Sequence, residues 1–352
     1  FSFKETQLLI MENKNIFINA SNIHSGGGKT LLNGLLQALK TRKESIYLFV
    51  DPRYHINFDL PESLVIIKIN KFLRFSVASR IKQISNKKSD QIIYFGNLPP
   101  IKKFKSLHVS LLLSSRFYVD SISMKGFKIT DSIKIYFEKL YFKFFIKNVS
   151  HIIVQTSSMS KKLTEFGFKK KISVLPFDDL GSVELKNVSN KEPSSFIYVA
   201  SLIPYKNHKR LLKAWNLLKD SGLNPKLYLT VDNDCVLKKW IKFFIKQNNL
   251  NIELLENLSR KELIERYIKT EVLIYPSLFE AYGLPLIEAK KYQMKIISSD
   301  LDYCWDFLSP DEFFNPEDVH SIVRAVKRYL KVKPNLDKIY NSKEFLNKVI
   351  KP

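Results

Sequence analysis

Two glutamates separated by seven residues flank a Gly-Leu-Pro sequence, in the stretch YPSLFEAYGLPLIEA. Gly283 supplies backbone freedom and Pro285 suits the first turn of a helix, so a helix is expected to begin here. Its first N–H groups, around Leu284, have no partner within the helix and can bind an anion such as a sugar diphosphate. Glu280 would then lie in the preceding loop, where it can face a sugar. Glu288 would lie one turn inside the helix, where it can accept hydrogen bonds from ribose hydroxyls. The alternative interpretation is two ordinary surface glutamates that the helix dipole stabilises.

A lysine follows a second predicted strand, in the stretch YVASLIPYKN. Lys206 would lie where this strand runs into a helix, with its charge facing a cleft. A cation in that place can neutralise the charge that builds up on a departing diphosphate. Ser201 and Asn207 belong to the same connection and are further candidates for binding that group. The alternative is that Lys206 is one more solvated lysine in a lysine-rich sequence.

Three consecutive glycines, Gly26, Gly27 and Gly28, lie between an apolar strand pattern and a helical pattern at residues 30–39. Strand, glycine turn and helix form the opening unit of a doubly wound α/β domain. We expect the glycines to let the backbone approach a ligand closely. The sequence GGGKT also suggests the phosphate-binding loop of NTPases. That loop needs a glycine where Ile23 stands, so this interpretation is rejected.

Apolar strand patterns alternate with helical patterns in both halves of the 352-residue chain, which predicts parallel sheets covered on both faces. The expected fold class is α/β, with two doubly wound Rossmann-like domains. The predicted parts are a first domain at residues 11–176, a linker at 177–194, a second domain at 195–341 and a C-terminal helix at 342–352 that packs back on the first domain. Such sheets bind ligands at the carboxyl ends of their strands, so the cleft between the domains is the expected site.

The net charge of +23 is unevenly distributed. Residues 1–176 carry 29 Lys and Arg against 11 Asp and Glu, which gives +18, whereas residues 177–352 carry 28 against 23, which gives +5. A positive field attracts polyanions, anionic lipid or phosphorylated substrates. Residues 133–146 and 236–247 are aromatic and basic at near-helical spacing, so each predicts a core-facing helix with outward lysines or a helix on an anionic membrane. The charge asymmetry favours membrane contact for residues 133–146.

The cysteines, the apolar runs and the Asp-x-Asp sequences indicate the cellular compartment of the protein and whether it binds a metal. The two cysteines, Cys235 and Cys304, are far apart, which argues against a disulfide framework and a cysteine zinc site. No signal peptide and no apolar run of about 18 residues is found, so a cytoplasmic protein is expected. Two Asp-x-Asp sequences, at residues 232–234 and 300–302, are expected to be loop carboxylates without a metal.

Together these stretches resemble the group 1 glycosyltransferases, which are retaining enzymes with the GT-B fold. The family's Glu–seven residues–Glu motif around Gly-Leu-Pro is matched by the two glutamates described above. Its strand–Pro-x-Lys-Asn motif is matched from Pro204 to Asn207, and residues 19–32 look like its glycine-rich first loop. The resemblance spans nearly the whole chain and is more specific in the second half.

The resemblance implies a role for each matched residue. Lys206 would hold the diphosphate, Glu288 would bind the nucleotide ribose, and Glu280 would contact the transferred sugar. Gly27 and Gly28 would approach the donor phosphate or the acceptor from across the cleft. The resemblance further implies a nucleotide-diphosphate sugar as co-substrate, an acceptor bound on the first domain, transfer with retention of configuration, and no cofactor or bound metal.

Two positions depart from the family's pattern. Ser201 stands where the family usually has an arginine, so one phosphate-binding cation is missing, and Arg210 is a candidate replacement. The family often has a histidine in the cleft of its N-terminal domain. His108 is a candidate for this catalytic position, with Ser114 or Ser115 as alternative occupants.

The predicted function is therefore transfer of a hexosyl-type sugar to a glycan or lipid-linked acceptor, in lipopolysaccharide O-antigen or capsule biosynthesis, on the inner face of the cytoplasmic membrane. Three alternatives remain open. A sugar-nucleotide epimerase of the same fold would isomerise the donor without an acceptor. A nucleic-acid-binding protein would fit the charge, but the aromatic and basic recognition modules it needs are not found, so nucleic acid is not an expected partner. A non-catalytic binding protein would fit the departures from the motif.

Overall fold

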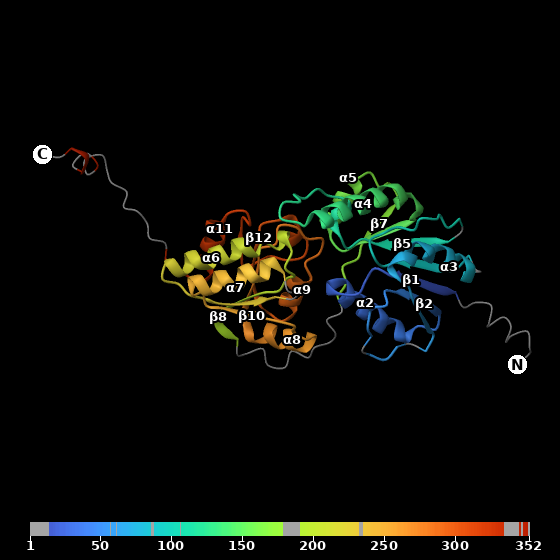
Figure 1. Ribbon diagram of the computed structural model, residues 1–352, viewed down its shortest axis with the longest axis horizontal. Helices are drawn as coiled ribbons and strands as arrows, with labels where there is room; N and C mark the ends of the chain where they lie inside the picture. Colours follow the sequence, from blue (N-terminus) through green and yellow to red (C-terminus); the bar gives the residue numbers. More distant parts are fainter. Residues whose placement is uncertain are drawn as a thin grey trace, which may run out of the picture.

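The computed structural model describes residues 14–56, 58–60, 62–85, 88–105, 107–178, 191–231, 235–333, 345 and 348–350. Two parallel sheets, each packed against helices, form two domains that lie side by side (Figure 1). The predicted linker and C-terminal helix fall largely outside the described residues, as does the Asp-x-Asp sequence at 232–234.

Within the described residues, seven parallel strands form the sheet of the N-terminal domain, in the order β3-β2-β1-β4-β5-β6-β7. The strands are β1 (Asn15–Ala20), β2 (Ser45–Val50), β3 (Leu64–Lys68), β4 (Gln91–Tyr94), β5 (His108–Leu112), β6 (His151–Val154) and β7 (Lys171–Val174). Successive side chains of β1 point to opposite faces, as strand geometry requires. Phe17 therefore joins one apolar cluster while Ile16 and Ile18 join another.

Six parallel strands of the described chain form the sheet of the C-terminal domain, in the order β10-β9-β8-β11-β12-β13. They are β8 (Glu192–Tyr198), β9 (Lys226–Thr230), β10 (Ile252–Leu255), β11 (Thr270–Tyr275), β12 (Lys295–Ser299) and β13 (Glu312–Phe314). Both sheets have the doubly wound order in which the direction of winding reverses once, between β1 and β4 and between β8 and β11. The predicted fold class is confirmed.

Helices and short 3-10 turns connect the strands. In the N-terminal domain they are α2 (Gly26–Ala38), η1 (Leu39–Thr41), η2 (Lys71–Ser76), α3 (Val77–Ile84), η3 (Arg116–Tyr118), α4 (Ile129–Phe145), η4 (Ile146–Asn148) and α5 (Ser157–Glu165). In the C-terminal domain they are η5 (Pro204–Lys206), α6 (His208–Asp220), α7 (Val236–Asn248), α8 (Arg260–Lys269), α9 (Leu284–Lys291), α10 (Asp302–Trp305) and α11 (Val319–Tyr329).

The first helix differs from the sequence-based expectation. It begins at Gly26, so the glycines form the first turn of α2, whereas the helix was expected at residues 30–39. The chain reverses earlier, where the N–H of Ile23 donates to the carbonyl of Ala20 at 2.9 Å. The backbone N–H groups of the glycines are therefore those of a helix start, which have no partner within the helix.

No helix among the described residues combines the length and the apolar character needed to cross a bilayer.

Candidate active site

The two points where the strand order reverses face each other across the junction of the domains. A cleft of about 1100 Å³ opens there. The N-terminal domain lines it with the start of α2, which follows β1. The C-terminal domain lines it with the segments that follow β8 and β11. Doubly wound sheets bind ligands where the strand order reverses, so the fold predicts a ligand site in the cleft.

Lys206 and Glu280 meet inside the cleft. The Nζ atom of Lys206 forms an ion pair with Oε1 of Glu280, and both side chains are 11% exposed. The hydroxyl of Tyr275, at the end of β11, donates to the same carboxylate oxygen at 2.9 Å. Burial, reinforced by the charge of Glu280, raises the pKa of Tyr275 well above its usual range, so this hydroxyl stays a donor. The two predicted residues thus form one polar group at the end of β11.

Asn207 and His208 follow Lys206 directly and form the turn into α6. Asn207 adopts a left-handed conformation with φ of 63°, and its amide donates to the carbonyls of Pro276 (3.0 Å) and Pro316 (2.7 Å). This use of the amide suits a residue that fixes the turn between β8 and α6, and the predicted contact of Asn207 with a donor stays a prediction. His208 is buried, and burial together with the charge of Lys206 lowers its pKa to about 3. The histidine is therefore neutral at ordinary pH and adds no second positive charge beside Lys206.

Two helix N-termini converge on the cleft, from opposite domains. Gly26, Gly27 and Gly28 of α2 line one wall, and Gly283 and Leu284 of α9 line the other. The approach is so close that a Cβ atom on Gly27 would lie 2.7 Å from Cδ1 of Leu284. Each helix start carries unpaired N–H groups and a partial positive charge, so the cleft between them favours an anion.

Glu288 lies one turn inside α9, as predicted, and it is 4% exposed. Its Oε1 atom is 2.6 Å from a guanidinium nitrogen of Arg260, and its Oε2 atom accepts from the hydroxyl of Tyr267 at 2.7 Å. Arg260, at the first position of α8, also lines the cleft. A carboxylate has about four acceptor sites, so Glu288 can accept further hydrogen bonds from a ligand.

Arg116 joins the N-terminal domain to the loop that carries Glu280. Its guanidinium group donates twice to the carboxylate of Asp302, at 2.7 and 2.8 Å, and once to Asp120 at 2.7 Å. It also contacts the backbone carbonyl of Glu280 at 3.4 Å and lies 5.3 Å from the ring centroid of Phe279. Although burial lowers the pKa of Arg116, the hydrogen bonds to Asp302 and Asp120 raise it overall, so the charge is secure.

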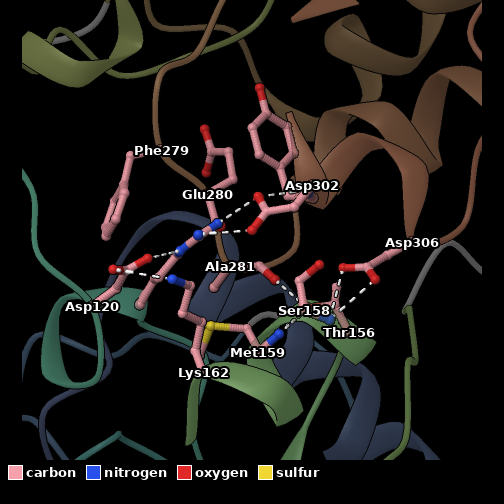
Figure 2. Close-up of polar contacts among 12 residues, drawn as sticks. Asp120, Thr156, Ser158, Met159, Lys162, Phe279, Glu280, Ala281, Asp302 and Asp306 are labelled. Atoms are coloured by element: carbon pink, nitrogen blue, oxygen red, sulfur yellow. Dashed lines mark hydrogen bonds and ion pairs between the residues drawn. The ribbon is translucent and has the colours of Figure 1, made fainter. Parts of the chain in front are cut away.

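A second set of contacts holds the same loop from α5 (Figure 2). Thr156 caps α5 by accepting from the N–H of Met159 at 3.2 Å, and its hydroxyl donates to the carbonyl of Ala281 at 3.1 Å. The N–H of Ser158 donates to the carboxylate of Asp306 at 3.1 Å. A carboxylate at a helix N-terminus is stabilising, so Asp306 caps α5 from the other domain. Residues 279–281 are thereby positioned by both domains.

Of the candidate residues in the N-terminal domain, Ser114 lies in the cleft and His108 lies outside it. His108 is the first residue of β5, is exposed, and lies beside His151, with 5.7 Å between the ring centroids. The cleft is at the carboxyl ends of the strands, so the prediction of a cleft position for His108 is wrong, because the residue begins its strand. Ser114, two residues beyond the end of β5, lines the cleft, and its N–H donates to Oδ1 of Asn97 at 2.7 Å. Ser115 precedes η3 as its N-cap residue.

Two of the remaining predicted site residues, Ser201 and Pro285, line the cleft. Arg210 donates to Oδ1 of Asn207 at 3.1 Å, which directs its guanidinium group to the turn of η5.

Sequence reasoning missed Arg260, Arg116 and Lys29 as cations at or beside the cleft. Lys29 follows the glycines directly, so its place could have been anticipated, whereas Arg116 and Arg260 depend on contacts between distant segments. No group of acidic, histidine or cysteine side chains among the described residues has the arrangement of a metal site.

Comparison with known proteins gives the same assignment for the C-terminal half. Residues 184–344 match the family model described as glycosyl transferases group 1. The match covers the described strands and helices of the C-terminal domain. The matched segment contains Lys206, Glu280 and Glu288, together with the sheet that positions them.

Two curated mannosyltransferases are similar to the chain. The serotype-specific mannosyltransferase WbdA of Escherichia coli is 30% identical over 139 residues, which are 39% of this chain and 17% of that protein. The O-antigen chain mannosyltransferase RfbU of Salmonella typhimurium strain LT2 is 24% identical over 243 residues, which are 67% of this chain and 66% of that protein. The chain thus spans about one sixth of the WbdA length.

Solved structures extend the likeness over both domains and establish the GT-B fold. A sucrose-phosphate synthase from Thermosynechococcus elongatus superposes with a TM-score of 0.68 at 14% identity, covering 91% of this chain and 90% of that chain. The lipopolysaccharide outer core galactosyltransferase WaaB superposes with a TM-score of 0.62 at 15% identity, covering 91% of each chain. The pneumococcal O-GlcNAc transferase GtfA, solved with UDP and GlcNAc, gives 0.65 at 12% identity, covering 91% of this chain and 93% of that chain.

Proposed function

We propose that the protein is a glycosyltransferase that moves a hexosyl-type sugar from a nucleotide-diphosphate sugar to a glycan or lipid-linked acceptor. The observation that carries the proposal is the convergence of the Lys206 ammonium group and the N-termini of α2 and α9 on one cleft. A diphosphate carries the charge that this arrangement favours. Similarity to RfbU and WbdA supports a mannosyl group as the sugar and O-antigen as the product.

The lining of the cleft fits the two ends of a nucleotide. Apolar side chains on the C-terminal side can pack against a planar base: they are Val199, Val231, Leu255, Leu258, Leu263 and Ile264. Glu288 and Arg260 lie on the same side and offer an acceptor and a donor to ribose hydroxyls. The sugar would then extend toward Glu280, and the acceptor would enter from the N-terminal domain.

The proposed step makes one bond and breaks one bond at the anomeric carbon. The bond from this carbon to the diphosphate oxygen breaks, and a bond from the acceptor hydroxyl oxygen forms on the same face, so configuration is retained. The acceptor proton passes to the departing diphosphate. Lys206 and the two helix N-termini stabilise the negative charge as it develops, which is the largest catalytic contribution expected of this site. The step needs no bound metal or cofactor.

In the free protein Glu280 neutralises Lys206, so donor binding must compete for the ammonium group. Two phosphates offer more negative charge than one carboxylate, and the helix N-termini add to their attraction. Glu280 then becomes free to accept a hydrogen bond from a hydroxyl of the transferred sugar. The loop contacts made by Arg116 and Thr156 keep Glu280 in place during this exchange.

A thermal-shift screen with nucleotide-diphosphate sugars tests the proposal, because a ligand that binds the native state raises its apparent stability. We expect GDP- or UDP-sugars to raise the melting temperature, with little effect in Lys206→Ala and the full effect in Lys213→Ala, an exposed lysine of α6. Incubation with the stabilising donor and washed membranes should transfer labelled sugar to the membrane fraction. Isomerisation of the donor without an acceptor would identify an epimerase instead, and no shift with any donor would contradict the proposal.

A further inference from the structure

Seven of the eight large apolar side chains that η2 and α4 expose to solvent form a set that we call the aromatic face. It consists of Phe72, Phe75, Ile129, Ile133, Tyr136, Phe137 and Phe144. Phe72 is 90% exposed and Ile129 is 77% exposed. The members on α4 are spaced by three, four or seven residues, so they lie along one stripe of the helix. Exposed apolar surface of this extent marks an interaction site.

The two parts of the aromatic face adjoin each other. The ring centroids of Phe75 in η2 and Tyr141 in α4 are 5.7 Å apart. Within α4 only Phe142 is fully buried, which shows how little of this helix the core uses. Figure 1 places α4 on the surface of the N-terminal domain.

Lysines alternate along the chain with the apolar residues that α4 contributes to the aromatic face. Residues 125–147 carry six lysines and two acidic residues, a net charge of +4. The lysines are Lys125, Lys128, Lys134, Lys139, Lys143 and Lys147. Protein–protein interfaces are depleted of lysine, whereas amphipathic helices that lie on anionic bilayers combine lysines with aromatic side chains. The composition therefore favours lipid as the occupant.

The other aromatic and basic helix, α7, is built differently. Trp240 stacks on Phe244 with 4.8 Å between ring centroids, and both pack against the core of the C-terminal domain. Only Val236 and Phe243 of its large apolar side chains are exposed. Helix α7 is thus a core-facing helix with lysines outside, and its exposed residues offer a matched control.

The aromatic face also lies near the carboxyl edge of the N-terminal sheet. A small cavity of about 40 Å³ is lined by Phe75 of the aromatic face, by Tyr141 of α4, and by Asn22 and Gly96 from the loops after β1 and β4. A bilayer in contact with the aromatic face would therefore bring lipid-linked groups close to the side of the N-terminal domain where the strand order reverses.

We propose that the aromatic face is a docking surface for the anionic surface of a lipid bilayer. Its aromatic rings enter the boundary between headgroups and acyl chains, and its lysines contact lipid phosphates. The proposal rests on the proposed function in one respect, since a lipid-linked acceptor is the reason for this enzyme to dock on a bilayer.

Co-sedimentation with vesicles tests the proposal without any need for activity. We expect the full chain to bind phosphatidylcholine vesicles that contain phosphatidylglycerol, and to bind pure phosphatidylcholine and high-salt samples far less. Phe72→Ser with Phe137→Ser should weaken binding by about tenfold or more, because two rings lose their burial in the bilayer. Val236→Ser with Phe243→Ser should bind like the parent.

Failure can be assigned to one proposal or the other. All variants replace exposed side chains, and an unchanged melting temperature, with the donor-induced shift retained, shows that fold and donor site are intact. No binding of the parent to anionic vesicles, or equal loss in both double variants, would overturn the docking surface. A parent dimer that Phe72→Ser with Phe137→Ser dissociates, without vesicle binding, would also overturn it. Vesicle binding by a protein that no nucleotide sugar stabilises would leave this surface intact and refute the proposed function.

Discussion

The ammonium group of Lys206 forms an ion pair with the carboxylate of Glu280, which lies 74 residues further along the chain, inside the interdomain cleft. The two residues follow β8 and β11, the strands between which the order of the C-terminal sheet reverses. The Lys206 ammonium group is therefore positioned where a doubly wound sheet binds its ligand. A donor diphosphate has to replace Glu280 as the partner of Lys206, so replacing the two side chains should have opposite effects on donor binding.

Glu280→Gln should separate donor binding from catalysis. The substitution keeps the shape of the side chain but releases Lys206 from its ion pair, so donor affinity should be unchanged or higher. Turnover should fall by roughly 100-fold, because the contact with the transferred sugar loses its charge. Steady-state kinetics would show a lower kcat without a higher KM. Glu317→Gln, at an exposed position, is the control and should behave like the parent. A Glu280→Gln enzyme with parental kcat would place the sugar elsewhere.

Gly27→Val should hinder the approach of the two helix N-termini. Its Cβ would lie 2.7 Å from Cδ1 of Leu284, and overpacking of this kind typically costs about 1–3 kcal/mol. We expect kcat/KM for the donor to drop about tenfold or more. Leu284→Ala should restore part of the loss when the two changes are combined. If the double variant is as impaired as Gly27→Val alone, the closeness of the helices is not what limits the enzyme.

Arg116→Lys should weaken the attachment of the loop that carries Glu280. Lysine keeps the charge but cannot donate twice to Asp302 while also reaching Asp120. The expected result is a several-fold decrease in kcat with a smaller change in the melting temperature, and a larger decrease in Arg116→Ala. Arg42→Ala removes an exposed ion pair with Glu44 in the same domain and serves as the control. Equal kinetics for Arg116→Ala and the parent would show that this contact does not position Glu280.

Much of the C-terminal site could be predicted from local sequence. The Gly-Leu-Pro sequence determines where α9 begins, and the helix was placed within one residue of its observed start. Lys206 follows a strand in an equally local pattern. The start of α2 was predicted too late, because glycine has a low helix propensity and three consecutive glycines do not indicate a helix.

Contacts between distant segments were beyond the reach of sequence patterns. Arg116 and Asp302 are 186 residues apart, and nothing in the neighbourhood of either residue indicates the other. The pairing of Arg260 with Glu288 likewise requires knowledge of where α8 packs. His108 was misplaced because the family resemblance outweighed its position: the residue begins its strand, whereas the cleft lies at the carboxyl ends of the strands.

His208 should make the protein less stable in mild acid. Burial lowers its folded pKa to about 3, whereas the unfolded chain binds a proton near pH 6.5. Below about pH 6.5 the unfolded state takes up more protons, so stability falls toward pH 3, by at most about 1.4 kcal/mol per pH unit from this residue. Urea unfolding of His208→Gln at several pH values should show a shallower decline than the parent. Parallel declines would assign the acid sensitivity to other groups.

The most direct test of the site compares the binding of a nucleoside diphosphate with that of the corresponding nucleoside by calorimetry. In the parent, the diphosphate should bind far more tightly than the nucleoside. In Lys206→Ala this difference should shrink by about 10- to 100-fold, the equivalent of a lost charge-assisted hydrogen bond, while nucleoside affinity stays the same. Lys213→Ala should preserve the difference. A Lys206→Ala protein that discriminates between the two ligands as well as the parent would contradict the account.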